Sequence, residues 1–192
     1  MQLTVRAEQP VHQLSKGGIT INKPKSITKK KSRKLLARLD DRDRLLVELM
    51  IKSGLRIGDA LKITAGQINK KMRVYESKSK RCRDFKIGKK LYSRLKILAE
   101  GKEINELVFH SERKQGVSVH RSTIHRRIKK ALKTLKFDAS AHSARKLYAQ
   151  NVYSKTKSVK KVQKAMNHHR ITTTAAYLDI DVDKIISKGV RT

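Results

Sequence analysis

MNHHRITTTAAYLDI, residues 166–180, places His168 nine residues before Tyr177 near the C-terminal end of the chain. We expect a turn around Asn167, because asparagine tolerates the left-handed backbone, and a short helix that carries Tyr177. A tyrosine in such a helix can pack in a core, or it can act as a nucleophile. The residues elsewhere in the chain have to decide between these two interpretations.

The composition is strongly basic. The 192 residues include 48 Lys and Arg against 16 Asp and Glu, so the formal net charge is +32. A polyanionic partner is indicated, because each Lys or Arg that neutralises a phosphate releases a condensed counterion. A membrane surface is the competing polyanion, but we find no apolar run approaching about 18 residues and no signal peptide. Nucleic acid is therefore the favoured partner.

Cysteine and histidine usage argues against disulfides and metal. Cys82 is the single cysteine, and the seven histidines show no zinc-ligand spacing with it. We therefore expect no internal disulfide, no bound metal and a reducing, intracellular location.

The hydrophobic pattern predicts a mainly α fold with one small antiparallel β-hairpin. Acidic residues at 40–41 begin one helix, and Ser53-Gly54 ends it. The other predicted elements are a helix over 57–65, strands over 72–75 and 84–87, a helix containing Leu91, Leu95 and Leu98, a short extended piece at 106–111, a long basic helix over 119–135, and three or four short helices separated near 139–141, 154–158 and 167–171.

Residues 9–39 contain no acidic side chain. This composition indicates either a solvated, partly disordered tail or a basic arm that lies on phosphates. GGITI, residues 17–21, could form a short strand. The basic residues that we expect to contact nucleic acid in this part are Lys29, Lys30, Lys31 and Arg33.

Two further stretches carry side chains suited to a phosphate. In SGLRIGDAL, residues 53–61, Arg56 follows a helix-ending glycine, where its guanidinium can fork onto two phosphate oxygens. In AHSARKLYAQ, residues 141–150, His142 and Arg145 are three residues apart and share one helix face. Each motif alone is weak, because a lone Arg is usually a surface charge and a lone His near a helix start is usually structural.

Taken together and in this order, the motifs resemble the catalytic domain of the tyrosine recombinases, the family of lambda-type phage integrases, Xer and Cre recombinases and fimbrial invertases. SGLRIGDAL resembles the family's TGLR-x-x-E/D-L box, HSAR its H-x-x-R box, and MNHHRITTTAAY its LGH-x-x-x-x-TT-x-x-Y box. Arg145 precedes His168 by 23 residues, as in the family. The resemblance covers about residues 30–185, with Met166-Asn167 in place of Leu-Gly and His169 as an extra, non-catalytic histidine.

The resemblance implies catalytic roles for six side chains. Tyr177 would be the nucleophile, Arg56 and Arg145 would hold the phosphate, His142 would move a proton and His168 would hydrogen-bond the phosphate. The family's lysine lies in the hairpin, where Lys78, 22 residues after Arg56, is favoured and Lys80 is the alternative. We also expect DNA contacts from Lys80, Arg81, Arg121, Arg126 and Arg127.

By this resemblance, residues 1–30 are an arm or linker, 31–180 the catalytic domain, and 181–192 a tail that docks either on a neighbouring protomer or on its own domain. The family's usual N-terminal DNA-clamping domain is not recognised, which fits either a naturally short recombinase or an excised catalytic domain.

The implied function is site-specific DNA recombination through a 3′-phosphotyrosine, without a cofactor. The implied partners are double-stranded DNA, further protomers in a tetrameric synapse and accessory DNA-bending proteins, in the cytoplasm and nucleoid of a bacterial, phage or archaeal host. Two alternatives stay open: a non-catalytic DNA-binding regulator with this fold, and a type IB topoisomerase-like enzyme.

Overall fold

The computed structural model describes residues 26–111 and 116–181. This part of the chain is mainly helical, with one two-stranded sheet, as predicted. The elements in order are α1 (Lys29–Leu36), α2 (Asp41–Ser53), α3 (Ile57–Ala60), the 3-10 turn η1 (Ala65–Gln67), β1 (Lys71–Glu76), β2 (Arg81–Lys86), α4 (Lys89–Ala99), α5 (Arg121–Leu132), α6 (Ala141–Thr156), α7 (Val159–Met166) and α8 (Ile171–Leu178).

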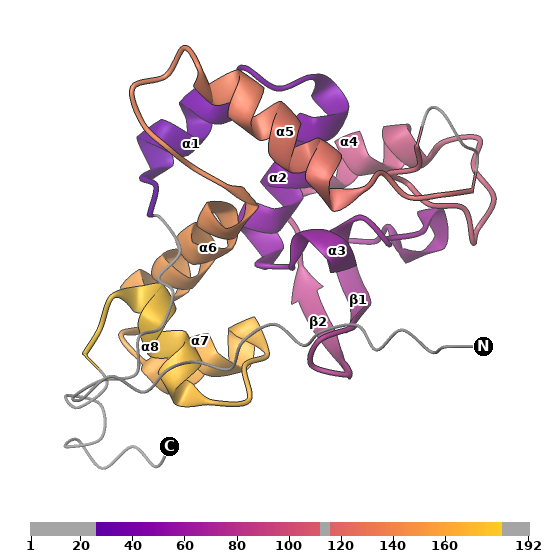
Figure 1. The fold of residues 1–192 in the computed structure, drawn as a ribbon. Coiled ribbons are helices and arrows are strands. Elements are labelled where there is room, and N and C mark those ends of the chain that lie inside the picture. The colour runs from indigo at the N-terminus through magenta and orange to yellow at the C-terminus, as the bar shows by residue number, and fades with distance from the viewer. Residues whose placement is uncertain (1–25, 112–115, 182–192) are drawn as a thin grey trace, which may run out of the picture.

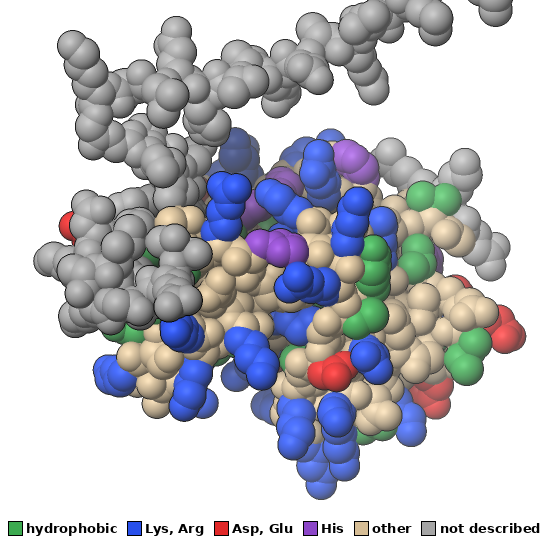
Figure 2. All heavy atoms as spheres, turned by 90° about the horizontal axis from the view of Figure 1, so that it is seen from below, with side chains coloured by type: hydrophobic (Ala, Val, Ile, Leu, Met, Phe, Trp, Pro, Cys, Tyr) green, Lys and Arg blue, Asp and Glu red, His purple; other side chains and the backbone are tan. Residues whose placement is uncertain are grey.

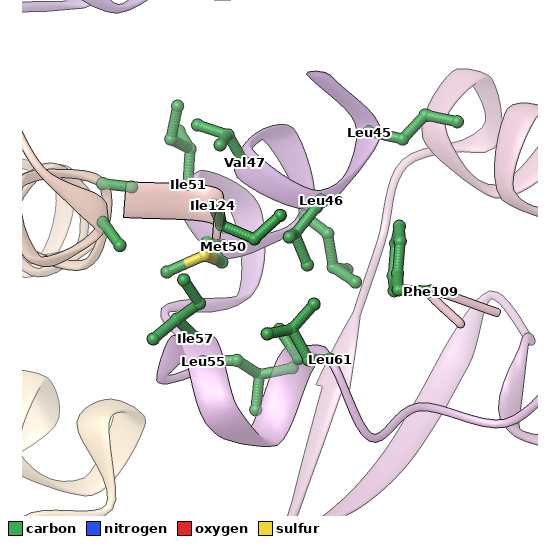
Figure 3. Close-up of a cluster of buried hydrophobic side chains, with 14 of the residues drawn as sticks. Leu45, Leu46, Val47, Met50, Ile51, Leu55, Ile57, Leu61, Phe109 and Ile124 are labelled. Atoms are coloured by element: carbon green, nitrogen blue, oxygen red, sulfur yellow. The ribbon is translucent and has the colours of Figure 1, made fainter. Parts of the chain in front are cut away.

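Helix α2 lies at the centre of the main core. Asp40 caps its start by accepting from Asp43 N at 2.7 Å, and Gly54 ends it in the left-handed conformation, as the sequence predicts. The apolar residues of α2 meet residues of α3, α5 and the segment after α4; Figure 3 shows Met50 and Leu46 among Ile57, Leu61, Phe109 and Ile124. Burial of this apolar surface is the main stabilising contribution to the fold.

The hairpin pairs β1 and β2 in antiparallel register, from Lys71 opposite Lys86 to Glu76 opposite Arg81. Alternate residues of β1 point inward, so Met72 and Val74 are buried against the core. Glu76 occupies the next inward position and is fully buried, which leaves residues 77–80 as the turn. Strand β1 extends one residue beyond the predicted 72–75 at each end, whereas β2 begins three residues before the predicted 84–87 and ends one residue earlier.

Helix α6 connects the main core to the C-terminal helices. It packs against α2 on one side and against α7 and α8 on the other, and Figure 1 shows it between α2 and these two helices. Asn167 ends α7 with φ of 54°, so the predicted left-handed turn is present. The predicted breaks between these helices are confirmed, but α6 is longer than the short helices that we expected.

Three predictions of local structure are wrong. Residues 29–36 form α1, capped by Thr28 and anchored by buried Leu35, so the alternative of a partly disordered tail is wrong for them. The helix predicted over 57–65 ends at Ala60, because Thr64 pairs with Leu107 and draws the chain out of the helix. Helix α5 is shorter at both ends than the predicted helix over 119–135. The possible strand at 17–21 and the tail at 182–192 lie outside the described residues.

Candidate active site

Six side chains from separate parts of the chain line one cavity of about 450 Å³. They come from the α2–α3 junction, the hairpin turn, α6, the α7–α8 turn and α8. They are the residues for which the sequence predicts catalytic roles, Arg56, Lys78, His142, Arg145, His168 and Tyr177. The fold thus gathers into one place residues that are up to 121 positions apart in the chain.

Arg56 owes its position to the sharp turn after α2. Gly54 adopts φ of 70° and lies so close to Tyr148 that an added Cβ would meet the ring at 2.3 Å. The chain then reverses, and Arg56 becomes the residue that precedes α3. Its half-buried guanidinium lies 3.3 Å from the Glu76 carboxylate, measured from Nη1 to Oε2. Glycine is required here, because both the backbone angle and the close approach exclude a side chain.

Arg145 lies beneath the cavity and is 1% exposed. Its Nη2 donates to Met166 O at 2.8 Å and to His168 Nε2 at 3.1 Å, and its Nη1 donates to Gly54 O. Burial, together with the positive charge of Arg56, lowers the pKa of Arg145 to about 10. The guanidinium therefore stays charged at neutral pH and joins the ends of α2 and α7 to α6.

His168 is buried between Arg145 and α8. A guanidinium always donates, so Nε2 of His168 accepts from Arg145, while Nδ1 lies 3.0 Å from Thr174 Oγ1. A neutral ring that carries its proton on Nδ1 satisfies both contacts. Burial lowers the pKa of His168 to about 3, and the charge of Arg145 adds to this effect. His168 is therefore neutral at physiological pH.

Tyr177 lies on α8 and is half-buried. Its ring centroid lies 5.3 Å from that of His168, with the two planes tilted by 52°, and 6.0 Å from Cζ of Arg145. The buried α8 residues Thr174 and Ala175 face the protein and fix the helix on α6 and α7. In this position Tyr177 lines the cavity.

Lys78 and His142 are the more exposed members of the cavity wall. Lys78 lies in the hairpin turn, which Asp59 holds by accepting from Ser77 N at 3.0 Å. His142 lies in the first turn of α6, and surrounding protein together with the charges of His125, Arg145 and nearby cations lowers its pKa. Lys80 lies in the same turn with φ of 51° but does not line the cavity.

The other predicted DNA contacts fall into distinct groups. Arg121, at the start of α5, lines the cavity. Exposed positions on α1, the hairpin and α5 are occupied by Lys29, Lys30, Lys31, Arg33, Lys80, Arg81 and Arg126. Arg127 is different, because it pairs with the buried carboxylate of Asp43 at 3.1 Å. Figure 2 shows basic side chains spread over one face of the molecule, with histidines among them and few acidic groups.

Sequence reasoning missed the residues that hold the site together. Glu76, Arg83 and the side chain of Asn167 are all in contact beneath the cavity. The alternation of Met72, Val74 and Glu76 carried a signal, since it places a carboxylate at an inward strand position. A buried carboxylate requires cationic partners, and this chain has many.

Neither a metal site nor a membrane span stands out in the part of the chain that the structure describes. No group of three or more His, Cys, Asp or Glu there could hold a metal ion. No helix among these residues is long and apolar enough to cross a membrane.

Comparison with curated proteins finds integrases and recombinases. The probable integrase/recombinase YoeC of Bacillus subtilis is 28% identical over 145 residues, which cover 74% of this chain and 80% of YoeC. The tyrosine recombinase XerC of Caldanaerobacter subterraneus is 25% identical over 190 residues, which cover 92% of this chain. The chain spans about half the length of XerC, 53%.

Solved structures show the same fold. The XerA recombinase matches with a TM-score of 0.71 at 18% identity, over 90% of this chain and 68% of XerA. A lambda integrase tetramer bound to a Holliday junction matches with a TM-score of 0.66 at 20% identity, over 87% of this chain and 51% of that one. The model of the phage integrase family matches residues 25–184. With this match over most of its length, the chain belongs to the phage integrase family, the family of the tyrosine recombinases.

Proposed function

We propose that this protein is a site-specific DNA recombinase that cuts and rejoins DNA through a covalent bond between Tyr177 and a 3′-phosphate. The observation that carries this proposal is the convergence of two arginines, a lysine, two histidines and one tyrosine on a single cavity. A phosphodiester needs its charge neutralised, a nucleophile and a proton for the leaving group, and these residue types supply all three.

In the proposed first step, the phenolic oxygen of Tyr177 attacks the scissile phosphorus. An Oη–P bond forms while the bond from phosphorus to the 5′ oxygen breaks, so the phosphodiester is exchanged for a 3′-phosphotyrosine ester and a 5′-hydroxyl is released. The phenol proton passes to His142, whose lowered pKa favours the neutral, proton-accepting ring. Lys78 donates a proton to the departing 5′ oxygen. A 5′-hydroxyl from a partner strand then reverses these steps.

The arginines stabilise the charge that builds up on the non-bridging oxygens. Arg56 reaches the cavity with a half-exposed guanidinium, whereas Arg145 has its Nη atoms engaged by Gly54, Met166 and His168. Arg145 therefore acts on the phosphate through charge at short range, or exchanges its bond to His168 for one to phosphate. In the second case His168 becomes available to hydrogen-bond the same phosphate once its proton moves to Nε2.

Between the two hairpin lysines, the position of Lys78 supports its choice as the proton donor. Lys78 lines the cavity, whereas Lys80, which has a left-handed backbone, does not. Lys80 and Arg81 then serve DNA binding, together with Arg121 and Arg126 and the exposed cations of α1.

The proposed partners are double-stranded DNA and further copies of the chain. One structure with this fold is a lambda integrase tetramer bound to a Holliday junction, and strand exchange needs more than one tyrosine. We place this activity in the cytoplasm, on the nucleoid of a bacterial, phage or archaeal host. We further propose residues 31–180 as the catalytic domain, residues 1–30 as an arm or linker, and residues 181–192 as a docking tail.

The proposal is tested with a pool of nicked DNA duplexes whose central sequence is randomised. Proteins covalently bound to DNA are captured under denaturing conditions, and the attached DNA is sequenced. We expect recovery of recurrent sequences with the parent protein and none with Tyr177→Phe.

Two other outcomes would overturn the proposal. Capture without sequence preference, with relaxation of supercoiled plasmid, would indicate a topoisomerase-like enzyme. No capture by a protein that still binds duplex DNA would indicate a non-catalytic binding protein.

A further inference from the structure

We propose that Glu76 is a positioning residue that holds the two phosphate-binding arginines in place. This inference rests on the proposed function for its consequence in catalysis, but the arrangement itself is visible in the contacts. Glu76 lies at the inward end of β1, is 0% exposed and does not line the cavity.

Both oxygens of the Glu76 carboxylate face cationic groups. Oε1 lies 3.1 Å from Arg83 Nη2 and 3.7 Å from Arg145 Nη1. Oε2 lies 3.3 Å from Arg56 Nη1 and accepts from Ser79 Oγ at 3.2 Å and from Asn167 Nδ2 at 3.0 Å. One side chain therefore contacts the α2–α3 junction, the hairpin turn, α6 and the α7–α8 turn.

The charge balance explains why a carboxylate belongs at this position. Three guanidiniums converge here, and without an anion among them they repel one another at short range in a poorly solvated interior. The mutual effect is visible at Arg145, whose pKa the positive charge of Arg56 lowers and the negative charge of Glu76 raises. Glu76 compensates part of this repulsion and leaves a net positive charge for the incoming phosphodiester.

Asn167 has two roles in the turn before His168, one through its backbone and one through its side chain. Its backbone needs only a residue that tolerates φ of 54°, which glycine would also do. Its amide in addition donates to Glu76 Oε2 and to Ser79 Oγ, both at 3.0 Å. The side chain thus connects the turn that carries His168 to the hairpin that carries Lys78.

The first test replaces the charge and keeps the shape, with Glu76→Gln. Single-turnover formation of the covalent Tyr177 adduct should slow by at least about tenfold, because misplaced arginines stabilise the transition state less well. The dissociation constant for duplex DNA should stay within about twofold, since many surface cations carry binding. If Glu76 were needed only for folding, its replacement would lower the rate of adduct formation and the affinity for DNA together.

A substrate with a methylphosphonate at the scissile position sharpens this test. The uncharged phosphonate has less need of the arginines, so the difference between parent and Glu76→Gln should shrink to about threefold or less. The matched control is Glu48→Gln, because Glu48 also pairs with an arginine, Arg94 at 2.7 Å, but lies away from the cavity. Its adduct formation should equal that of the parent.

A third measurement does not depend on catalysis. The order parameter of the Arg56 Nε–H, from nitrogen-15 relaxation of the protein alone, should fall in Glu76→Gln and stay unchanged in Glu48→Gln.

If Glu76→Gln does not fold, Asn167→Gly replaces it, because glycine suits the backbone there and removes only the bonds to Glu76 and Ser79. We expect adduct formation about three- to tenfold slower in that variant.

The results separate the two proposals. The positioning role of Glu76 would be overturned by an unchanged Arg56 order parameter in Glu76→Gln. It would also be overturned if Glu76→Gln or Asn167→Gly formed the adduct as fast as the parent. Neither result would affect the proposed recombinase function. A parent protein that forms no adduct, with an Arg56 order parameter that still falls in Glu76→Gln, would overturn the recombinase function and support the positioning role.

Discussion

Lowering the pH should decrease the free energy of unfolding of this protein through protonation of His168, by an amount that follows from the structure. The pKa of this buried histidine is about 3 in the folded chain, against its ordinary value of 6.5. Below the ordinary value the unfolded chain binds a proton that the folded chain does not bind. The contribution of His168 to stability is therefore complete above about pH 6.5 and is lost as the pH falls toward about 3.

The size of the effect follows from the width of this window. Each pH unit within it lowers the free energy of unfolding by about 1.4 kcal/mol. Between about pH 7 and about pH 4.5 the loss assigned to His168 is about 2.5 kcal/mol. At about pH 4.5 the ring of His168 is still neutral in the folded chain, so the size of the loss depends on the pKa of the histidine in the unfolded chain.

The assay is urea unfolding of the parent and of His168→Gln at several pH values. Glutamine can accept from Arg145 and donate to Thr174, but it does not titrate. The parent should lose about 2.5 kcal/mol more than His168→Gln over this range. Parallel profiles for the parent and His168→Gln would refute the assignment of a buried, neutral histidine.

Two further predictions concern the turn before the first arginine and the DNA-binding face. Gly54→Ala should lower the free energy of unfolding by about 2–5 kcal/mol, because the new Cβ would strain the left-handed backbone and overlap the ring of Tyr148. Gly58→Ala is the control, since the space around Gly58 is open, and it should not lower the free energy of unfolding measured in urea. Arg126→Ala should reduce the slope of log affinity against log salt by about 0.9, and Arg127→Ala should leave the slope unchanged but destabilise the fold, because Asp43 loses its partner. Equal slopes for the parent and Arg126→Ala would contradict this.

The sequence predicted those parts of the fold that depend on local signals. Asp40 and Gly54 define the two ends of α2 through capping and a left-handed terminus, and Asn167 does the same for the turn before His168. The six candidate catalytic residues were identified because their spacing and order are specific as a set. The helix ends at Gly54 and Asn167 position Arg56 and His168, whereas the other four residues reach the cavity from the hairpin turn, α6 and α8.

The remaining features depend on contacts between distant segments. The strand alternation of β1 indicates that Glu76 points inward, but its pairing with Arg56 and Arg145 depends on segments far from the hairpin in sequence. The early end of α3 likewise depends on pairing between Thr64 and Leu107, 43 residues further along. Helix α1 was missed because its charged residues outnumber its apolar ones, although Leu35 docks on the core.

The most direct test of the account is to identify the amino acid that becomes bonded to DNA. The captured adduct is digested with nuclease and trypsin, and the peptide that carries a nucleotide remnant is found by mass spectrometry. The chain has five tyrosines, and cleavage after Arg170 and Lys184 isolates Tyr177 from the others. The account predicts the remnant on Tyr177, joined to a 3′-phosphate. A remnant on the exposed Tyr75 or on any other residue, or a link to a 5′-phosphate, would contradict it.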